Sequence, residues 1–309
     1  MNRFIRTFIL TSILSLVSLS LASGEAGNSI VDIQLAKSIM EEANAGNPKA
    51  QYALGGMYEK GLFNFKIDLE KAVLWYTKAA VEGLDVAQNK LGTIYSKGEG
   101  VEVDHVQAAA WYLKAAEQGN TKAQNNLGLS YTKGLGVPKD FIMAVMWLRK
   151  AAEKGEAEAQ HNLAVRYHFG EGVPKDYKEE AFWMSQAAEK GHAGAQSNLG
   201  LFYAEGKGVE KDNAKAIYWL RRAAEQGHSI AQHNLGHRYS DGDGVAKDEV
   251  EAYAYYNLAG ISLEASRNSL AILEKKLSRE EIAAGQIRTK ELQKLVEATR
   301  VTLGVKNVK

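Results

Sequence analysis

The 309-residue sequence contains no cysteine and only three prolines. Without cysteine, the chain cannot form disulfide bonds, thiolate metal sites or a cysteine nucleophile. Its formal net charge is only +1, so it lacks the basic balance that is typical of nucleic-acid-binding proteins. Hydrophobic residues make up 45% and charged residues 24% of the chain. This composition is typical of a folded protein and not of a disordered one.

Beyond the N-terminus, the sequence also lacks any apolar run long enough to span a bilayer. At the N-terminus, Arg3 and Arg6 precede an apolar stretch from Phe8 to Leu21, and Ala22 suits cleavage after it. As a helix this stretch would reach about 21 Å, short of a hydrocarbon core of roughly 30 Å. We therefore predict a secretory signal peptide over residues 1–22, with an uncleaved anchor as the alternative. The mature protein is expected in the periplasm or outside the cell.

The dipeptide Ala-Gln recurs at a nearly constant spacing. It begins at positions 50, 87, 123, 159, 195 and 231, and a spacing this regular indicates a tandem array. We predict six repeats over residues 50–266, namely 50–86, 87–122, 123–158, 159–194, 195–230 and 231–266. Residues 23–49 and 267–309 are expected to form helical caps, the second extending into a tail.

Each repeat is predicted to contain two helices. In the second repeat Ala87, Leu91 and Tyr95 fall on one side of a helix that begins at the Ala-Gln alanine. Gly98 is expected to end this helix, and Asp104 to cap the next one. A phosphate-binding loop would need a strand before its glycines and a helix immediately after them. The paired glycines are therefore interpreted as a turn between two helices.

The pattern "AQxxLGxxYxxGxGVxxDxxxAxxWYxKAAEqG" resembles the Sel1-like repeat, a relative of the tetratricopeptide repeat. The resemblance implies an all-α fold, a right-handed α-solenoid of antiparallel helix pairs that holds other molecules, usually proteins. The first repeat departs from the pattern at "GLFNFKID", residues 61–68, which is one residue longer and lacks the second glycine.

Binding residues are expected where the repeats differ. Counting from the Ala-Gln alanine, positions +2, +6, +9 and +10 vary and lie opposite the packed side. The resemblance implies that they line a concave groove. This face changes from Lys97 and Lys133 to Glu205 and Asp241, which could orient an extended peptide. Drift of unconstrained surface positions is the alternative. The other candidates on this face are His161, His168, Phe169, His233 and His237.

Two further sets of polar residues recur beside this face. Position +3 carries Asn126, Asn162, Asn198 and Asn234, whose amides could donate to and accept from a peptide backbone, or else bond to a neighbouring turn. Position +7 carries Arg166 and Arg238, which could serve acidic groups or only solvent. His233 and His237 are spaced to chelate a metal, but no third ligand is evident. We predict no metal site and no cofactor.

No nucleophile–base pair or catalytic motif stands out, and the recurring aspartates are assigned to helix caps. We predict a non-catalytic, monomeric scaffold that binds a protein or peptide of unknown identity, and no nucleic acid or membrane. The resemblance suggests envelope assembly, regulation of signalling, or host contact. One alternative is a binder of cell-wall glycan or its peptide stems, for which Phe169 and Phe202 supply aromatics. The other is a metal-dependent hydrolase using His233 and His237.

Overall fold

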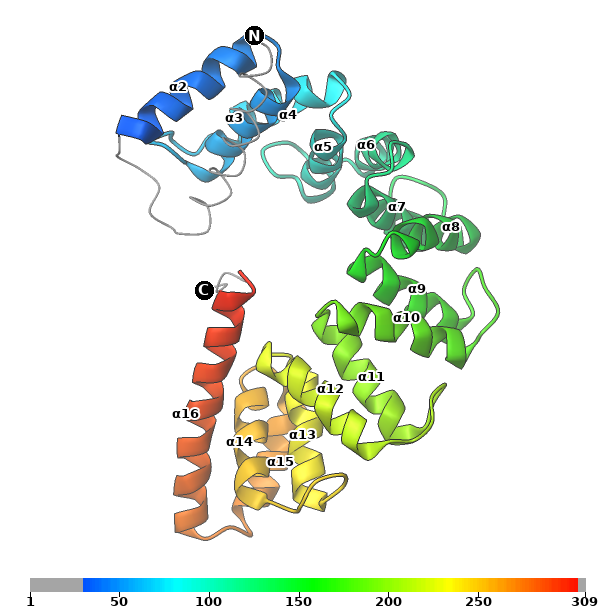
Figure 1. Cartoon of the computed structure of the whole chain (residues 1–309), viewed down its shortest axis with the longest axis vertical. Helices are drawn as coiled ribbons and strands as arrows, with labels where there is room; N and C mark the ends of the chain where they lie inside the picture. Colours follow the sequence, from blue (N-terminus) through cyan, green and yellow to red (C-terminus); the bar gives the residue numbers. More distant parts are fainter. Residues whose placement is uncertain (1–29, 305–309) are drawn as a thin grey trace, which may run out of the picture. The chain divides into compact units, whose positions relative to one another are not determined.

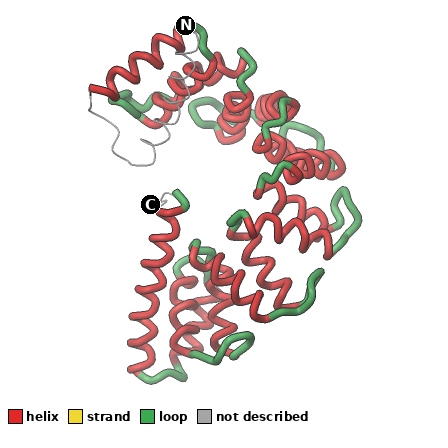
Figure 2. Tube along the Cα trace, viewed as in Figure 1, coloured by secondary structure: helices red, strands yellow, loops and turns green. Residues whose placement is uncertain are grey.

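A computed structural model describes residues 30–304, and these contain helices but no strand, as Figures 1 and 2 show. The prediction of an all-α chain of repeated helix pairs is confirmed. The predicted signal peptide lies outside the described residues, as do residues 23–29 of the predicted N-terminal cap. The chain divides into two compact units, Met1–Asp140 and Phe141–Lys309, which are described separately.

The first unit contains one lone helix followed by helix pairs. The lone helix packs against the first helix of the first pair, and each pair packs on the next. The helices are α2 (Ile30–Asn44), α3 (Pro48–Lys60), α4 (Leu69–Val81), α5 (Asp85–Lys97), α6 (His105–Glu117) and α7 (Thr121–Lys133).

The second unit begins with a second helix of a pair and continues with three full pairs and two C-terminal helices. Its helices are α8 (Phe141–Glu153), α9 (Ala157–Phe169), α10 (Tyr177–Glu189), α11 (Ala193–Glu205), α12 (Asn213–Glu225), α13 (Ser229–Asp241), α14 (Glu249–Gly260), α15 (Glu264–Glu274) and α16 (Arg279–Thr302).

The helix starts correct one detail of the sequence analysis. The first helix of each pair begins two residues before the Ala-Gln alanine, and not at it. The residue before this start is the N-cap: Asn120 Oδ1 accepts from the backbone N–H of Ala123 at 3.0 Å. His192 and His228 accept in the same way through Nδ1. The predicted aspartate caps of the second helices are confirmed at Asp104, Asp176, Asp212 and Asp248. Asp68 caps α4 in the same way, although it was not predicted to do so.

The predicted turn glycines are also confirmed. Gly98 and Gly100 have φ of 73° and 79°, in the left-handed region that favours glycine. In the longer first turn, two non-glycine residues, Phe63 and Asn64, take left-handed angles of 52° and 64°. Phe63 is only 7% exposed, so burial of its ring in the core accompanies this unfavourable backbone conformation.

The small residue at position +5 lets the two helices of a pair approach closely. A Cβ added at Gly92 or Gly236 would overlap the ring of Tyr112 or Tyr256, which lies over the glycine. In the fourth repeat Ala164 takes this position, and the residue equivalent to the tyrosine is Met184. The two positions therefore fit together in size, as close-packed interiors require.

The glutamine of each Ala-Gln pair joins one repeat to the next. Its amide nitrogen donates to a backbone carbonyl eight residues earlier, near the end of the preceding helix, at 3.0–3.3 Å in all six cases. All six side chains are buried. This role explains why the dipeptide recurs, and the sequence analysis did not predict it. The glutamines are Gln51, Gln88, Gln124, Gln160, Gln196 and Gln232.

The C-terminal helices depart from the repeat, as predicted. Ser278 and Glu281 form a capping box at the start of α16. Helix α15 packs on α14, whereas α16 packs along α14 and reaches α12, where Arg300 donates to the Gln226 carbonyl (Figure 1). Gly285 permits the close packing of α16 on α14, because a Cβ at this position would overlap the ring of Tyr253 on α14.

Candidate functional site

The last residue of the first helix is exposed in every pair, although the rest of that helix is largely used for packing. In the first unit this residue is a lysine, and Lys97 has 63% of its side chain exposed. In the second unit it is Phe169, which is 64% exposed, and then two acidic residues. This set, which we call the helix-end column, comprises Lys60, Lys97, Lys133, Phe169, Glu205 and Asp241.

The structure corrects the extent of the predicted binding face. At position +2, Asn125 and Ser197 are only 5% and 1% exposed, and Ala204 at position +9 is 6% exposed. Position +2 is covered because it faces the neighbouring repeat: Asn89 accepts a hydrogen bond from Asn126 there. Phe202 is also buried, at 6% exposure, so it cannot stack on a sugar. The accessible part of the face is the helix-end column and its immediate neighbours.

The four asparagines at position +3 do not act alike. Asn126 Nδ2 donates to Asn89 Oδ1 of the preceding repeat at 3.0 Å, so this amide is engaged within the protein and not with a turn. Asn162 and Asn198 are half-buried. Asn234 Nδ2 is buried and finds no hydrogen-bond acceptor among the described residues. Of the four, Asn126 is shown to bond across the junction between repeats.

Arg166 and Arg238 are paired with their own turns. Each reaches forward five residues, Arg166 to Glu171 and Arg238 to Asp243, and forms a hydrogen-bonded ion pair. Only 13% and 15% of the two arginine side chains remain exposed. Their guanidinium groups therefore hold the turn after the first helix.

His161 stacks on His192, with ring centroids 4.5 Å apart and the planes 16° from parallel. His192 Nδ1 accepts the cap bond from Ala195, so in its neutral form the proton sits on Nε2, which lies 3.0 Å from Glu158. Burial, and then the neighbouring His192, lower the pKa of His161. His192 therefore serves as the N-cap of α11, and His161 stacks on this cap.

His233 lies against α15, and His237 packs beside it against α14. Their rings meet edge to face at 4.7 Å, and both approach Tyr256. His233 Nδ1 lies 2.8 Å from Ser266 Oγ, and burial lowers the pKa of His233. Burial also raises the pKa of Tyr256 to about 12. Across residues 30–304 no group of three His, Cys, Asp or Glu side chains is placed to hold a metal ion.

Three titratable side chains meet in the second unit. Glu180, on α10, is 3% exposed, and its Oε1 lies 2.9 Å from Nδ1 of His168 at the end of α9. Lys207, in the turn after α11, places Nζ 3.1 Å from the same Nδ1 and 3.4 Å from Glu180 Oε2. The rings of Tyr177 and Phe202 face this ammonium at 4.5 and 4.8 Å. We call these five residues the Glu180 site.

Sequence reasoning selected His168 from this site but missed Glu180 and Lys207. The available signal was the repeat itself, because the position of Glu180 is alanine in the other five repeats. Those alanines are Ala72, Ala108, Ala144, Ala216 and Ala252, and each is at most 2% exposed. A carboxylate at a buried alanine position is an exception that folding does not require.

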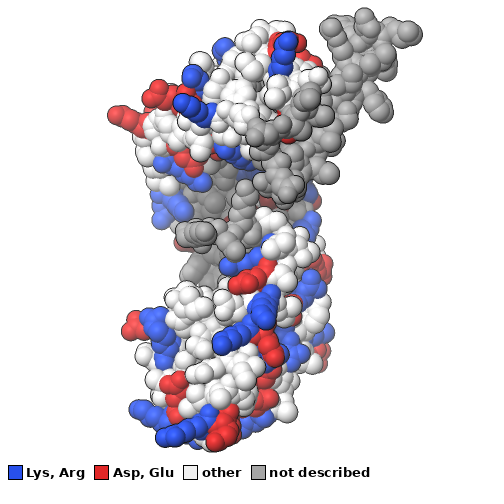
Figure 3. Space-filling view, turned by 90° about the vertical axis from the view of Figure 1, so that its left-hand side faces the viewer, with Lys and Arg blue, Asp and Glu red and all other residues white. Residues whose placement is uncertain are grey.

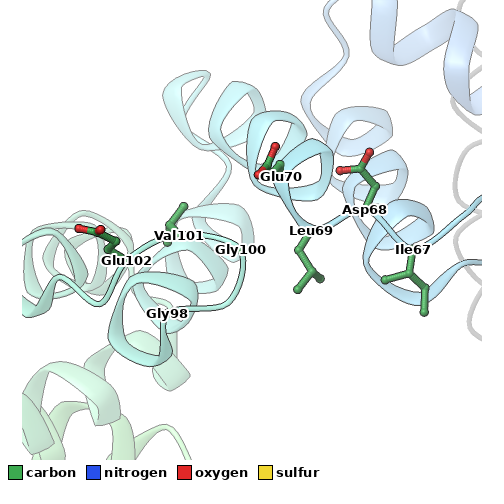
Figure 4. Close-up of a pocket in the computed structure, with 8 residues that line it drawn as sticks. All are labelled: Ile67, Asp68, Leu69, Glu70, Gly98, Gly100, Val101 and Glu102. Atoms are coloured by element: carbon green, nitrogen blue, oxygen red, sulfur yellow. The ribbon is translucent and has the colours of Figure 1, made fainter.

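The first unit has a separate shallow hollow of about 610 Å³ between the turn of the first repeat and that of the second (Figure 4). Leu69 lies in it against Gly100, and the carboxylates of Asp68, Glu70 and Glu102 stand around it. Asp68 is already a helix cap and an ion-pair partner of Lys71. On the face shown in Figure 3, acidic and basic side chains are interspersed and do not gather by sign.

Comparison with known proteins gives the same architecture. The family model for the Sel1 repeat matches residues 48–83, 85–120, 121–156, 157–192, 193–228 and 229–260. Among solved structures, the protective antigen c5321 of uropathogenic Escherichia coli, which has an SLR fold, is 35% identical with a TM-score of 0.70. That match covers 92% of this chain but 60% of the antigen, so the chain spans about 60% of its length. A Sel1 repeat protein from Oxalobacter formigenes is 37% identical, with a TM-score of 0.67 and coverage of 71% of this chain and 89% of that one.

No match was found among proteins with curated functions. The helix pairs, their inter-repeat glutamines and the exposed helix-end column define an all-α repeat protein of the α-solenoid class. Within that class, the chain belongs to the Sel1 repeat family. Sel1 repeat proteins are generally protein-interaction scaffolds, and their fold is typically non-catalytic. None of the helices at residues 30–304 is long and apolar enough to cross a membrane.

Proposed function

We propose that this protein is an exported, non-catalytic scaffold that binds a protein partner along the helix-end column. The column carries the proposal because its residue is exposed in all six first helices, while its side-chain chemistry changes from repeat to repeat. Positions that stack the repeats are nearly invariant within the chain, so selection for binding can act mainly on the exposed positions.

The chemistry of the column suits different partner segments in the two units. In the first unit, Lys60, Lys97 and Lys133 offer three ammonium groups for an acidic segment. In the second unit, Phe169, Glu205 and Asp241 offer an apolar ring and two carboxylates for a basic segment. Exposed charges of this kind mainly set specificity and the rate of association. Envelope assembly, regulation of signalling and host contact are the roles in which such a scaffold would act.

The site of binding is testable by photo-crosslinking at single positions. A photoreactive amino acid is introduced at Lys97 or Glu205 in the column, and at Ala110 or Ala214 as controls. Both controls are exposed residues of second helices. We expect crosslinks to one protein from column positions only. Equal crosslinking from the control positions would show that the column is not the binding surface.

Export rests on the N-terminal sequence. The basic residues, apolar stretch and small residue at Ala22 support cleavage before Ser23. N-terminal sequencing of the protein from fractionated cells tests this. A mature chain that begins at Ser23 in the periplasm or medium is expected, whereas a full-length chain in the cytoplasm would refute the proposal.

A further inference from the structure

The Glu180 site contains a buried carboxylate that the other five repeats lack. Five repeats place an alanine where the fourth places Glu180, and the carboxylate is 96% removed from solvent, since 4% of the side chain is exposed. Burying a carboxylate is costly unless it is paired and hydrogen-bonded. Residues that break an otherwise consistent local pattern tend to occur at functional sites.

The pairing of this carboxylate is incomplete. His168 Nδ1 lies within hydrogen-bond distance of both Glu180 Oε1 and Lys207 Nζ. One ring nitrogen either donates to the carboxylate or accepts from the ammonium, but it cannot do both. Glu180 Oε2, with Lys207 Nζ at 3.4 Å, accepts no hydrogen bond from the described residues. The buried carboxylate therefore has capacity for a further donor.

The surroundings of that carboxylate are those of a cation site. The rings of Tyr177 and Phe202 face one ammonium position, beside the carboxylate. Aromatic faces attract ammonium and guanidinium groups through their quadrupole. Lys175 Nζ also lies over the Tyr177 ring, 4.9 Å from its centroid.

The resident cation, Lys207, is replaceable. It lies in a turn between two glycines, and the other repeats with this turn carry Glu99, Leu135, Glu171 or Asp243 at the same place. Its side chain is 22% exposed, so the ammonium can leave the site without refolding of either helix. His168 also packs edge to face against Phe169, the exposed aromatic residue of the helix-end column.

From these contacts we propose that the Glu180 site receives a lysine or arginine side chain of the partner, which displaces Lys207 from the carboxylate and the two rings. The inference rests on the proposed scaffold function and specifies the chemistry of the partner at this point: a basic side chain next to an apolar one that meets Phe169. Lys207 acts as a stand-in that keeps Glu180 neutralised while no partner is bound.

The site can be tested without the partner, using n-butylammonium as a lysine mimic and butyrate as the anionic control at constant ionic strength. Lys207→Ala vacates the cation position, and Lys211→Ala, an exposed residue of the same turn, is the matched control. At ten times its dissociation constant, butylammonium should raise the Tm of Lys207→Ala by about 2–4 °C. It should have no specific effect on Glu180→Ala/Lys207→Ala. An equal effect on both variants, or an equal effect of butyrate, would overturn the proposal.

If Lys207→Ala fails to fold, the full-length wild-type protein still provides a test. Titration with N-acetyl-lysine amide should shift the backbone amide signals of Gly206 and Gly208 in the wild type, and not in Glu180→Ala. Shifts that persist in Glu180→Ala would refute a carboxylate-centred site. These results are independent of the crosslinking experiment, so a failure of the cation site is distinguishable from a failure of the scaffold proposal.

Discussion

The inter-repeat glutamines offer a sharp test, because two of them are matched except for one hydrogen bond. Gln160 and Gln196 both donate to a carbonyl eight residues earlier, each at 3.0 Å, and both are at most 3% exposed. Gln196 Oε1 also accepts from Gln226 Nε2 at 2.8 Å. Gln160 Oε1 is buried and accepts nothing from the described residues. In the repeat that contains Gln160, the position equivalent to Gln226 is occupied by Lys190.

Replacing either glutamine with methionine keeps the unbranched shape and removes the polar atoms. In Gln160→Met one hydrogen bond is lost, and an unpaired buried oxygen is removed with it. The receiving carbonyl, that of Ala152, still accepts from Gly155 N–H. A typical hydrogen bond contributes about 0.5–1.5 kcal/mol net, so we expect a cost of about 1 kcal/mol or less.

In Gln196→Met two hydrogen bonds are lost, and no unpaired atom is relieved. Gln226 Nε2 keeps its bond to the Gly191 carbonyl. The expected cost is about 2 kcal/mol, which is about 1 kcal/mol more than for Gln160→Met.

Urea unfolding followed by circular dichroism, fitted with nearest-neighbour coupling between repeats, measures both costs. A Gln226→Met background supplies the control, because there the two glutamine variants should differ by much less. Equal costs in the wild-type background would refute the assignment of the second hydrogen bond as the source of the difference.

Three further predictions concern backbone space and protonation. Gly136→Ala should destabilise by about 2–4 kcal/mol, since its Cβ would overlap the first carbonyl of α6, whereas Gly46→Ala, also left-handed but in open space, should cost about 1 kcal/mol in urea unfolding. Gly285→Ala should destabilise the folded protein by about 1–3 kcal/mol, because the new Cβ overlaps Tyr253, although helix propensity gains about 1 kcal/mol. Faster proteolytic release of α16 would show this loss of stability, and an unchanged rate of release would contradict it. The pKa of His161 is lowered in the folded protein, so the unfolded chain binds a proton at this residue more readily. The stability that neutral His161 contributes is therefore complete above the unfolded pKa of 6.5, and it is lost as the pH falls through the folded pKa. His161→Asn should therefore lose less Tm between pH 7.5 and 5.5 than the wild type, and an unchanged pH dependence would count against this.

The fold could be predicted from the sequence because the repeat supplies its own internal comparison. The 36-residue spacing, the aspartate at the start of each second helix and the turn glycines each have a local physical reason, and all are present in the structure. The role of the glutamine could not be read in this way. Its acceptor lies eight residues back across a turn, and helical periodicity alone does not bring these two groups together.

The binding face was predicted less well, for a related reason. A helical wheel separates the packed side from the opposite side within one repeat, but it contains no information on the neighbouring repeat. Asn125 and Ser197 therefore looked free, although both are almost fully buried. Arg166 likewise looked available for a partner, but in the structure it is paired with Glu171 of the following turn. The last residue of the first helix is the position of the predicted face that is exposed in all six repeats.

The comparison between repeats also predicts how substitutions in the Glu180 site change the stability of the protein. Glu180→Ala restores the residue of the other five repeats and leaves Lys207 and His168, which are 22% and 37% exposed and can be hydrated again. We expect it to be neutral or stabilising, as when buried ion pairs are replaced by apolar residues.

Lys207→Ala removes the same ion pair from the other side, but it leaves the nearly fully buried carboxylate of Glu180 without its cation. Breaking a buried pair in this way costs about 3–5 kcal/mol. Urea unfolding of the two variants gives the sign of each change. If Glu180→Ala were instead the more destabilising of the two, the carboxylate would be part of the framework of the fold, and its replacement of an alanine would need no partner to explain it.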